Sequence, residues 1–154
     1  MGTKDIKNHK QVDGRTITGG QPTEDQIRSA SEEGFQVVVN LATEDPRYSL
    51  KNEGGLVRSL GMTYHHIPVD WSRPRKEDLD EFEDLMKELD GQSVLIHCAA
   101  NYRVTAFYAL YGMRALGWSR ERAQEFIASV WQPERFPAWP EFIAQQMDDA
   151  DENL

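Results

Sequence analysis

Three short strand-like segments, separated from one another by helical patterns, constrain the fold of this chain more than any other feature. They lie near residues 35–41, 63–67 and 93–97, and the first is a β-branched run that begins just after Gly34. Such runs, bounded by glycine and polar loops, are typical of buried strands. Strands that alternate with helices favour a parallel sheet with helices on both faces. We therefore predict an α/β fold, a single domain whose mostly parallel sheet is flanked by helices.

Capping residues and apolar spacing place the helices between these strands. Thr23 is typical of a helix N-cap, Gln26 stands where it completes a capping box, and Gly34 is typical of a helix end. Apolar residues spaced three and four apart predict an amphipathic helix over residues 75–90. The other predicted elements are a short strand within 15–22, a loop over 42–55, the end of a short helix at 56–61, and helices over 103–117, after the Ser119 cap and over 141–147.

The length of 154 residues suits one domain with a single core. We predict that residues 15–147 form this domain, with a loosely ordered segment at 1–14 and an acidic tail at 148–154. No apolar run approaches the roughly 20 residues that span a bilayer, and the polar N-terminal stretch lacks the apolar core of a signal peptide. We accordingly expect a cytoplasmic protein.

The balance of charge and the cysteine count restrict the partners of the chain. A formal net charge of −9 disfavours non-specific binding to nucleic acid or to an anionic membrane, so we expect neither partner. Cys98 is the single cysteine, which excludes an intramolecular disulfide and a multi-cysteine metal site. His65 and His66 are adjacent in a predicted strand and point to opposite faces. We predict no metal site and no cofactor.

The segment HCAANYRVT, which begins at His97, joins a predicted strand directly to a predicted helix. Amide groups at a helix N-terminus lack intrahelical acceptors and bind anions. A cysteine at the start of such a turn has its thiolate stabilised by these amides, and Arg103 adds a planar fork of donors that suits two phosphate oxygens. The predicted phosphate-binding residues are Ala99, Ala100, Asn101, Tyr102 and Arg103.

This arrangement suits transfer of a phosphoryl group. The Cys98 thiolate would attack phosphorus, and the leaving group would need a proton from a carboxylic acid. Asp70 follows the end of another predicted strand, and parallel strands carry their ligand sites at their carboxyl ends. Asp78 and Asp80 suit the role less because they fall inside a predicted helix. We therefore predict that Asp70 is the general acid.

HCAANYRVT resembles the HC-x5-R-[S/T] signature of the protein tyrosine and dual-specificity phosphatases. Over about residues 15–130 the chain is similar to a bacterial group of phosphatase-like proteins related to the beta-lactamase-hydrolase-like domain, in the stretches TGGQPTEDQI, GFQVVVNL, IPVDWSRP and HCAANYRVTAFYALY. The resemblance implies metal-independent hydrolysis of phosphomonoesters, with phosphotyrosine as the default substrate. It also implies a nucleophilic Cys98, Arg103 as phosphate ligand, Asp70 as general acid, and Thr105 at the position that hydrogen-bonds the sulfur.

One departure from that signature leaves other functions open. Four residues, not five, separate Cys98 from Arg103, and Val104 stands at the usual arginine position. This shorter loop also occurs in sulfurtransferases of the rhodanese type, whose cysteine carries a persulfide, and a non-catalytic phosphate-binding module is a third candidate. Asp70, Thr105 and His97 favour the phosphatase; we predict that His97 hydrogen-bonds the loop backbone and helps to hold the thiolate. Trp71 either forms a pocket wall for an aryl phosphate or anchors its loop in the core.

Overall fold

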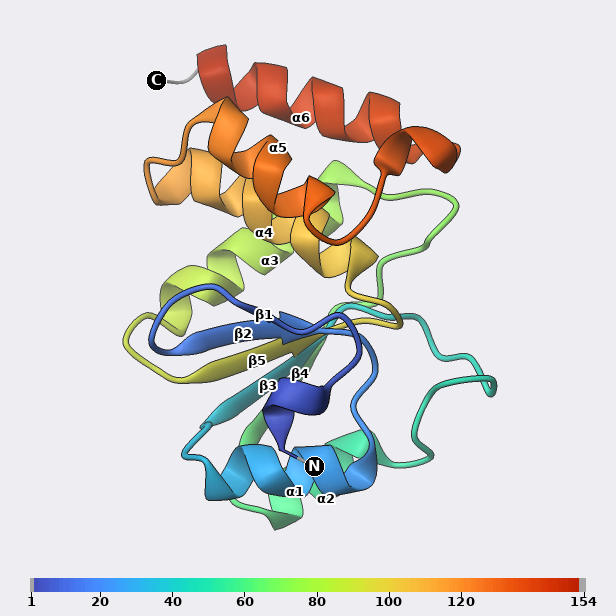
Figure 1. Cartoon of the computed structure of the whole chain (residues 1–154), viewed down its shortest axis with the longest axis vertical. Helices are drawn as coiled ribbons and strands as arrows, with labels where there is room; N and C mark the ends of the chain where they lie inside the picture. The colour runs from blue at the N-terminus through green and yellow to red at the C-terminus, as the bar shows by residue number, and fades with distance from the viewer. Residues whose placement is uncertain (1, 153–154) are drawn as a thin grey trace.

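A computed structural model describes residues 2–152, which form a five-stranded sheet between two layers of helices (Figure 1). The strand order is β1-β2-β5-β3-β4; β1 pairs antiparallel to β2, and all the other pairs are parallel. The strands are β1 (Lys10–Gln11), β2 (Thr16–Gly19), β3 (Val37–Asn40), β4 (Thr63–His66) and β5 (Val94–His97). The predicted α/β fold with a mostly parallel sheet is confirmed.

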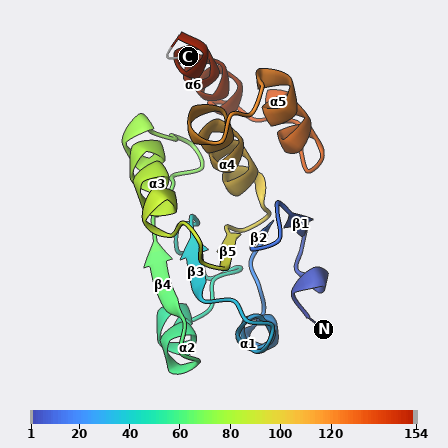
Figure 2. The same cartoon turned by 90° about the vertical axis from the view of Figure 1, so that its left-hand side faces the viewer.

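The helices divide between the two faces of the sheet (Figure 2). On one face lie α1 (Glu24–Glu32) and α2 (Glu53–Ser59), and on the other lie α3 (Lys76–Glu88), α4 (Tyr102–Ala115), α5 (Arg120–Ala128) and α6 (Trp139–Glu152). Two short 3₁₀ turns, η1 (Thr3–Asp5) and η2 (Pro133–Arg135), complete the elements of the described chain. Within residues 2–152, no helix has the length and apolar character that crossing a membrane requires.

The alternation of side chains along the strands produces two cores. In β3, Val37 and Val39 face the larger core beneath α3 to α6, whereas Val38 faces the smaller core beneath α1 and α2. The central strand β5 divides in the same way, with Ile96 in the larger core and Leu95 in the smaller one. This period of two is what a strand buried on both faces requires. The sheet is therefore held rigidly, and the loops at its carboxyl ends are held with it.

The predicted helix starts have the expected chemistry. Thr23 Oγ1 accepts from Gln26 N at 3.1 Å, and Gln26 Oε1 accepts from Thr23 N at 3.0 Å, which completes the capping box of α1. Ser119 caps α5 by accepting from Arg122 N at 3.0 Å. The chain after α1 turns at Gly34 with a φ of +95°, a conformation that glycine adopts without strain.

Both ends of the described chain differ from the loose segments that the sequence predicts. Near the N-terminus, Thr3 and Ile6 are buried, and Thr3 hydrogen-bonds Glu33, the residue that follows α1, through its backbone N and its hydroxyl. At the other end α6 continues to Glu152, and Arg120 holds it through bonds to Asp148 and Asp151. Long-range burial and ion pairs order these polar stretches. Residues 1, 153 and 154 of the two predicted segments lie outside the described residues.

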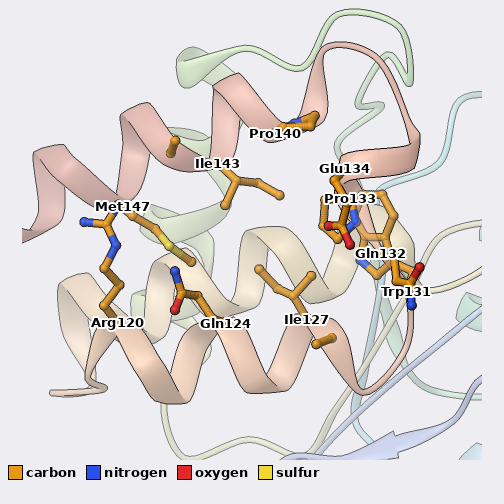
Figure 3. Close-up of a pocket in the computed structure, with 12 residues that line it drawn as sticks. Arg120, Gln124, Ile127, Trp131, Gln132, Pro133, Glu134, Pro140, Ile143 and Met147 are labelled. Carbon is orange, nitrogen blue, oxygen red and sulfur yellow. The ribbon is translucent and has the colours of Figure 1, made fainter.

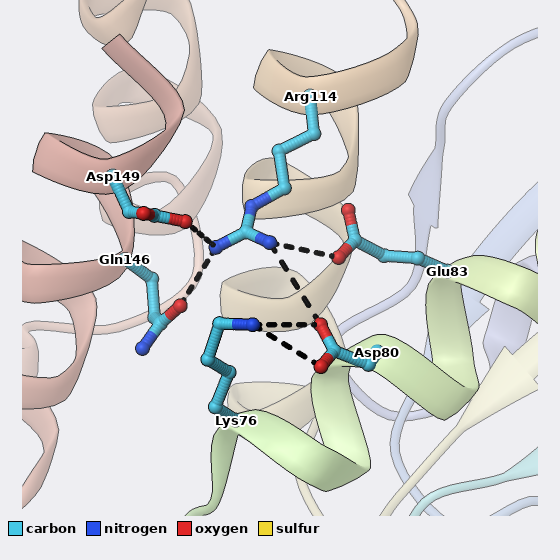
Figure 4. A network of polar contacts seen from close by, with 6 residues as sticks. All are labelled: Lys76, Asp80, Glu83, Arg114, Gln146 and Asp149. Atoms are coloured by element: carbon cyan, nitrogen blue, oxygen red, sulfur yellow. Dashed lines mark hydrogen bonds and ion pairs between the residues drawn. The ribbon is translucent and has the colours of Figure 1, made fainter. Parts of the chain in front are cut away.

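Arg114 on α4 ties the outer helices together (Figure 4). Its guanidinium contacts Glu83 of α3 at 3.3 Å and Asp149 of α6 at 3.0 Å, and it donates to Gln146 of α6 at 2.7 Å. Asp80 lies 3.9 Å away and also pairs with Lys76. Burial raises the pKa of Glu83 above its ordinary value, although Arg114 acts in the opposite direction. The network replaces apolar packing at the point where three helices meet.

Candidate active site

A pocket of about 430 Å³ lies at the carboxyl ends of β4 and β5. Of the predicted site residues it brings together Asp70, Trp71, Cys98, Ala99, Ala100, Tyr102 and Arg103. Thr43, Asp45, Arg47, Tyr48 and Ser72 complete its lining. His97, Asn101 and Thr105 lie outside this lining and are buried in the structure around it. The convergence follows from the parallel sheet, because its strands end at one edge.

The loop that follows Cys98 has three consecutive carbonyl groups held by neighbouring residues. The Cys98 carbonyl lies 3.1 Å from His97 Nδ1, and the Ala99 carbonyl accepts from Gln21 N at 3.0 Å. The Ala100 carbonyl accepts from Asn8 Nδ2 at 2.9 Å. Since the N–H and C=O of one peptide plane point in opposite directions, these bonds fix the directions of the N–H groups that follow them.

Those N–H groups form a cradle for an anion. In the described chain the amides of Ala99, Ala100, Tyr102, Arg103 and Val104 have no backbone acceptor. The last three of them open α4, a helix of 14 residues whose N-terminus carries partial positive charge. Cys98 stands at the start of this turn, lines the pocket and is otherwise buried. The turn can therefore stabilise a thiolate and bind a phosphate or a similar oxyanion.

Asn101 closes the turn in a left-handed conformation. Its φ is +69°, and its side-chain nitrogen donates to Asn8 O at 2.7 Å and to Thr18 Oγ1 at 3.0 Å. Asparagine is among the few residues other than glycine that adopt this conformation readily. Asn101 was predicted as a phosphate-binding residue, but its side chain is fully buried and bonds the N-terminal segment instead. Its contribution to the cradle is the shape of the backbone.

Arg103 forms part of the pocket wall despite its shifted position. Its Nη1 donates to Val69 O at 2.9 Å, its Nη2 lies 3.5 Å from Tyr48 Oη, and its side chain is 5% exposed. The guanidinium also lies over the Trp71 ring, 6.0 Å from the centroid. A guanidinium has five N–H donors, so these contacts orient it and leave donors for an anion.

Asp70 lies in the same pocket on the loop after β4. Its Oδ1 accepts from Ser72 N at 2.9 Å, and its backbone carbonyl accepts from Arg73 N at 3.1 Å. This small turn fixes the direction of the carboxyl group while the side chain stays exposed. A carboxyl group in this place can exchange protons with solvent and with a group bound in the pocket.

Aromatic rings build one side of the pocket, and Trp71 both lines this pocket and packs against the core. Its ring packs on Trp131, Phe136 and Trp139 at 5.3 to 5.6 Å between centroids. Tyr102 stacks on Trp131 at 4.8 Å with an angle of 3° between the rings. The wall is consequently rigid and suits a planar apolar group.

Thr105 does not have the contact that the resemblance implies. Its hydroxyl donates toward the Asn101 and Tyr102 carbonyls, at 2.9 and 3.1 Å, and accepts from Trp131 Nε1 at 2.9 Å. A threonine inside a helix commonly bonds the carbonyl one turn earlier. The hydroxyl proton is therefore directed to the backbone rather than to the sulfur of Cys98.

Glu53 is a member of the site that the sequence analysis does not identify. Its carboxylate is buried at the start of α2, with Oε2 lying 2.5 Å from His97 Nε2 and Oε1 accepting from Gln21 Nε2 at 2.8 Å. The predicted bond from His97 to the loop backbone is present at the Cys98 carbonyl. A glutamate in a predicted loop gives no local sign that it is buried. Its place in the site depends on His97, which is 44 residues away in the sequence.

Two other features carry no predicted site residue. An apolar groove of about 340 Å³ lies between α5 and α6, where Ile127 and Ile143 face each other in the middle, Met147 lies toward one end and Trp131 lies at the other (Figure 3). Within residues 2–152, no group of three or more His, Cys, Asp or Glu side chains is arranged so that it could hold a metal ion. The pocket at Cys98 is thus the place where the predicted catalytic groups meet.

Comparisons with known proteins identify relatives of the chain. Residues 1–135 match the family described as DSP-PTPase phosphatase fused to NAD+ kinase. Over 102 residues the chain is 28% identical to a beta-lactamase hydrolase-like protein of Xylella fastidiosa (strain 9a5c). The match includes 64% of this chain and 23% of that protein, so the chain spans less than a quarter of the curated relative. The predicted resemblance is confirmed.

Solved structures agree with this assignment. A candidate phosphatase (DUF442) from Shewanella putrefaciens CN-32 is 30% identical, with a TM-score of 0.85 over 95% of this chain and 92% of its own. A Cys-to-Ser variant of TpbA from P. aeruginosa, solved in complex with phosphotyrosine, is 13% identical, with a TM-score of 0.70 over 94% of this chain and 90% of its own. The second similarity shows a shared fold.

Proposed function

The chain belongs to the family of DSP-PTPase phosphatases fused to NAD+ kinase, and on this premise we propose that it hydrolyses phosphomonoesters through a phosphocysteine, without a metal ion. The observation that carries the proposal is the pocket itself. Cys98 stands in it at the start of a turn of unpaired amides, and Arg103 and Asp70 line the same space from two other positions. Nucleophile, anion cradle and proton donor are the three parts that the reaction needs.

In the first step the Cys98 thiolate attacks phosphorus, so that an S–P bond forms as the ester P–O bond breaks. The amides of the turn and the Arg103 guanidinium hold the phosphoryl oxygens while their charge redistributes. Asp70 gives its proton to the leaving oxygen, which departs as an alcohol or a phenol.

In the second step water attacks the phosphocysteine. Asp70, now a carboxylate, takes a proton from the water as the P–S bond breaks. Inorganic phosphate leaves and the Cys98 thiolate is restored. Thr105 has no part in this step, because its hydroxyl bonds the backbone and Trp131.

Phosphotyrosine is the first substrate class to test. The pocket has an aromatic side built from Trp71 and Tyr102, and the TpbA relative was solved in complex with phosphotyrosine. A planar ring between the cradle and this wall would be held by stacking as well as by its phosphate. We include phosphoserine as the comparison, because its alkyl leaving group lacks the ring.

The loop length favours a second candidate, a sulfurtransferase of the rhodanese type. Four residues separate Cys98 from Arg103, as in the shorter loops of that class. In this reaction the Cys98 thiolate takes a sulfur atom from thiosulfate, releases sulfite, and passes the sulfur of its persulfide to an acceptor such as cyanide. Asp70 has no step in it, so the two candidates differ in their need for the acid.

The test is hydrolysis of para-nitrophenyl phosphate in the presence of a chelator, for the wild type and for Cys98→Ser. We expect turnover by the wild type and none by the serine variant, since the hydroxyl is a far weaker nucleophile at neutral pH. Vanadate should inhibit by occupying the cradle. Binding of vanadate without turnover would overturn the proposal in favour of a phosphate-binding module, and turnover of thiosulfate with cyanide alone would favour the sulfurtransferase.

A further inference from the structure

Glu53 is a buried carboxylate that the proposed reaction does not use. It is 6% exposed, and its two oxygens contact His97 Nε2 at 2.5 Å and Gln21 Nε2 at 2.8 Å. A carboxylate out of contact with water is costly unless partners compensate its charge. Both partners come from other elements, β5 and the loop after β2, so the contacts were formed by the fold and not by the local sequence.

Both partners of Glu53 also hydrogen-bond backbone carbonyls of the loop that begins at Cys98. His97 Nδ1 lies 3.1 Å from the Cys98 carbonyl, and the backbone N–H of Gln21 donates to the Ala99 carbonyl at 3.0 Å. These are the first two carbonyls of the turn, and their peptide planes also carry the amides of Ala99 and Ala100. Because N–H and C=O point in opposite directions, a group that holds the carbonyls also aims the amides.

The atoms that contact the two ring nitrogens of His97 determine the direction of its hydrogen bonds. A carbonyl can accept but not donate, so Nδ1 donates to the Cys98 carbonyl. Burial raises the pKa of Glu53, but the charge and hydrogen bond of His97, together with Gln21 and the charge of His66 on β4, outweigh it and lower the pKa. The ionised carboxylate is an acceptor too, so both ring nitrogens of His97 face acceptors, one on the Cys98 peptide and one on Glu53.

We propose that Glu53 is a positioning residue for the nucleophile. Through His97 and Gln21 it holds the Cys98 and Ala99 carbonyls away from the pocket. The amides of the same peptide planes are thereby aimed at the Cys98 thiolate and stabilise it. The inference rests on the proposed use of Cys98 as a nucleophile, but not on the identity of the substrate.

The experiment measures alkylation of Cys98 by iodoacetamide against pH, followed by intact mass. Cys98 is the single cysteine of the sequence, so one adduct reports one thiol. In Glu53→Gln a neutral amide replaces the carboxylate, which weakens the contact with His97 and loosens the hold on the Cys98 carbonyl. We expect the pH of half-maximal alkylation to rise by about one unit, a tenfold lower rate at acidic pH. Inorganic phosphate should also protect the thiol only at higher concentration.

The control variant is Glu32→Gln, which makes the same chemical change at an exposed position on α1. It should leave the alkylation profile and the protection by phosphate unchanged. The variants and the wild type share every other charged or ionisable group that lines the pocket around the thiol. These groups are Asp45, Arg47, Tyr48, Asp70, Tyr102 and Arg103.

A merely structural role predicts a different result. Glu53→Gln would then unfold at a lower temperature while its alkylation midpoint stayed at the wild-type pH, and this outcome overturns the proposal. If Glu53→Gln fails to fold, Glu53→Asp takes its place in the experiment. Aspartate keeps the charge but is one methylene too short to reach His97, so the pH of half-maximal alkylation should rise in this variant too. Alkylation requires no hydrolysis, so an inactive wild type refutes the proposed function and leaves this test readable.

Discussion

Replacing Arg114 by leucine removes the cation at the junction of α3, α4 and α6 (Figure 4). The side chains of Arg114 and Glu83 are 18% and 10% exposed, so Glu83 would become a carboxylate without its partner in a mostly dry site. Breaking a fully buried pair costs about 3–5 kcal/mol, and exposed pairs contribute about 0–1 kcal/mol. The partners Asp149 and Asp80 are 43% and 48% exposed and belong to the second class. We expect Arg114→Leu to lose about 2–3 kcal/mol of unfolding free energy at pH 7.

The loss should depend on pH in a definite direction. Burial already raises the pKa of Glu83 against the opposing effect of Arg114, so removal of Arg114 raises that pKa further. An acid whose pKa is higher in the folded than in the unfolded state destabilises the fold when it ionises, and this penalty disappears as the pH falls below its unfolded value. The difference between the variant and the wild type should therefore shrink from pH 7 toward about pH 4.

Urea unfolding followed by tryptophan fluorescence measures these differences at both pH values. Adding Glu83→Gln to Arg114→Leu should restore part of the stability at pH 7, because it removes the unpaired charge. Arg120→Leu is the matched control: Arg120 and its partners Asp148 and Asp151 are 37%, 66% and 41% exposed, so its loss should stay near 0–1 kcal/mol, approximately. A loss for Arg114→Leu no larger than this control, or one that is equal at both pH values, would show that the Arg114–Glu83 pair does not behave as a buried ion pair.

Three further substitutions test individual contacts of the site. Thr105→Val leaves Trp131 Nε1 without its acceptor, so it should lower the unfolding free energy by about 1–3 kcal/mol and leave the rate of single-turnover dephosphorylation of Cys98 unchanged. A lower rate without a loss of stability would be evidence for the Thr105–sulfur contact that the resemblance implies. Asp70→Asn should remove the decline of para-nitrophenyl phosphate turnover at high pH, since that decline reports loss of the proton from the general acid; an unchanged decline would assign the proton to another group. Asn101→Gly should be more stable in urea than Asn101→Ala by about 1 kcal/mol, because both lose the bonds to Asn8 and Thr18 but alanine alone is strained at a φ of +69°; equal stability would refute the role of backbone strain.

Local chemistry was sufficient to predict the framework of this fold. The Thr23 capping box, the β-branched strand after Gly34 and the Ser119 cap each depend on residues within a few positions of one another, and the structure has all of them. The meeting of Cys98 and Asp70 in one pocket was also predictable. It requires only that parallel strands end at the same edge of a sheet.

The parts that sequence reasoning missed depend on partners far along the chain. Glu53 falls in a stretch predicted as a loop, because Gly54 and Gly55 disfavour a helix; the Asn52 cap and the burial of Val57 override that preference. Ile6 and Thr3 belong to a polar terminus that becomes ordered only through contact with α1 and its surroundings. No local pattern announces such contacts.

The fate of the Thr105 hydroxyl was hidden for the same reason. Its position relative to Cys98 matches the phosphatase signature. However, Trp131, which lies just after α5, donates a hydrogen bond to the Thr105 hydroxyl. The hydroxyl then completes a buried chain of bonds from the tryptophan to the backbone of the turn. Position in a motif could not predict this, because the competing partner lies outside the motif.

The proposed phosphocysteine can be observed in the intact mass of the protein after rapid acid quenching of its reaction with an aryl phosphate. We expect a phosphoryl group to be added to Cys98, Cys98→Ser to lack the adduct, and the adduct to decay as inorganic phosphate appears. Hydrolysis that proceeds with no adduct on Cys98, or with the phosphoryl group on another residue, would contradict the proposed mechanism.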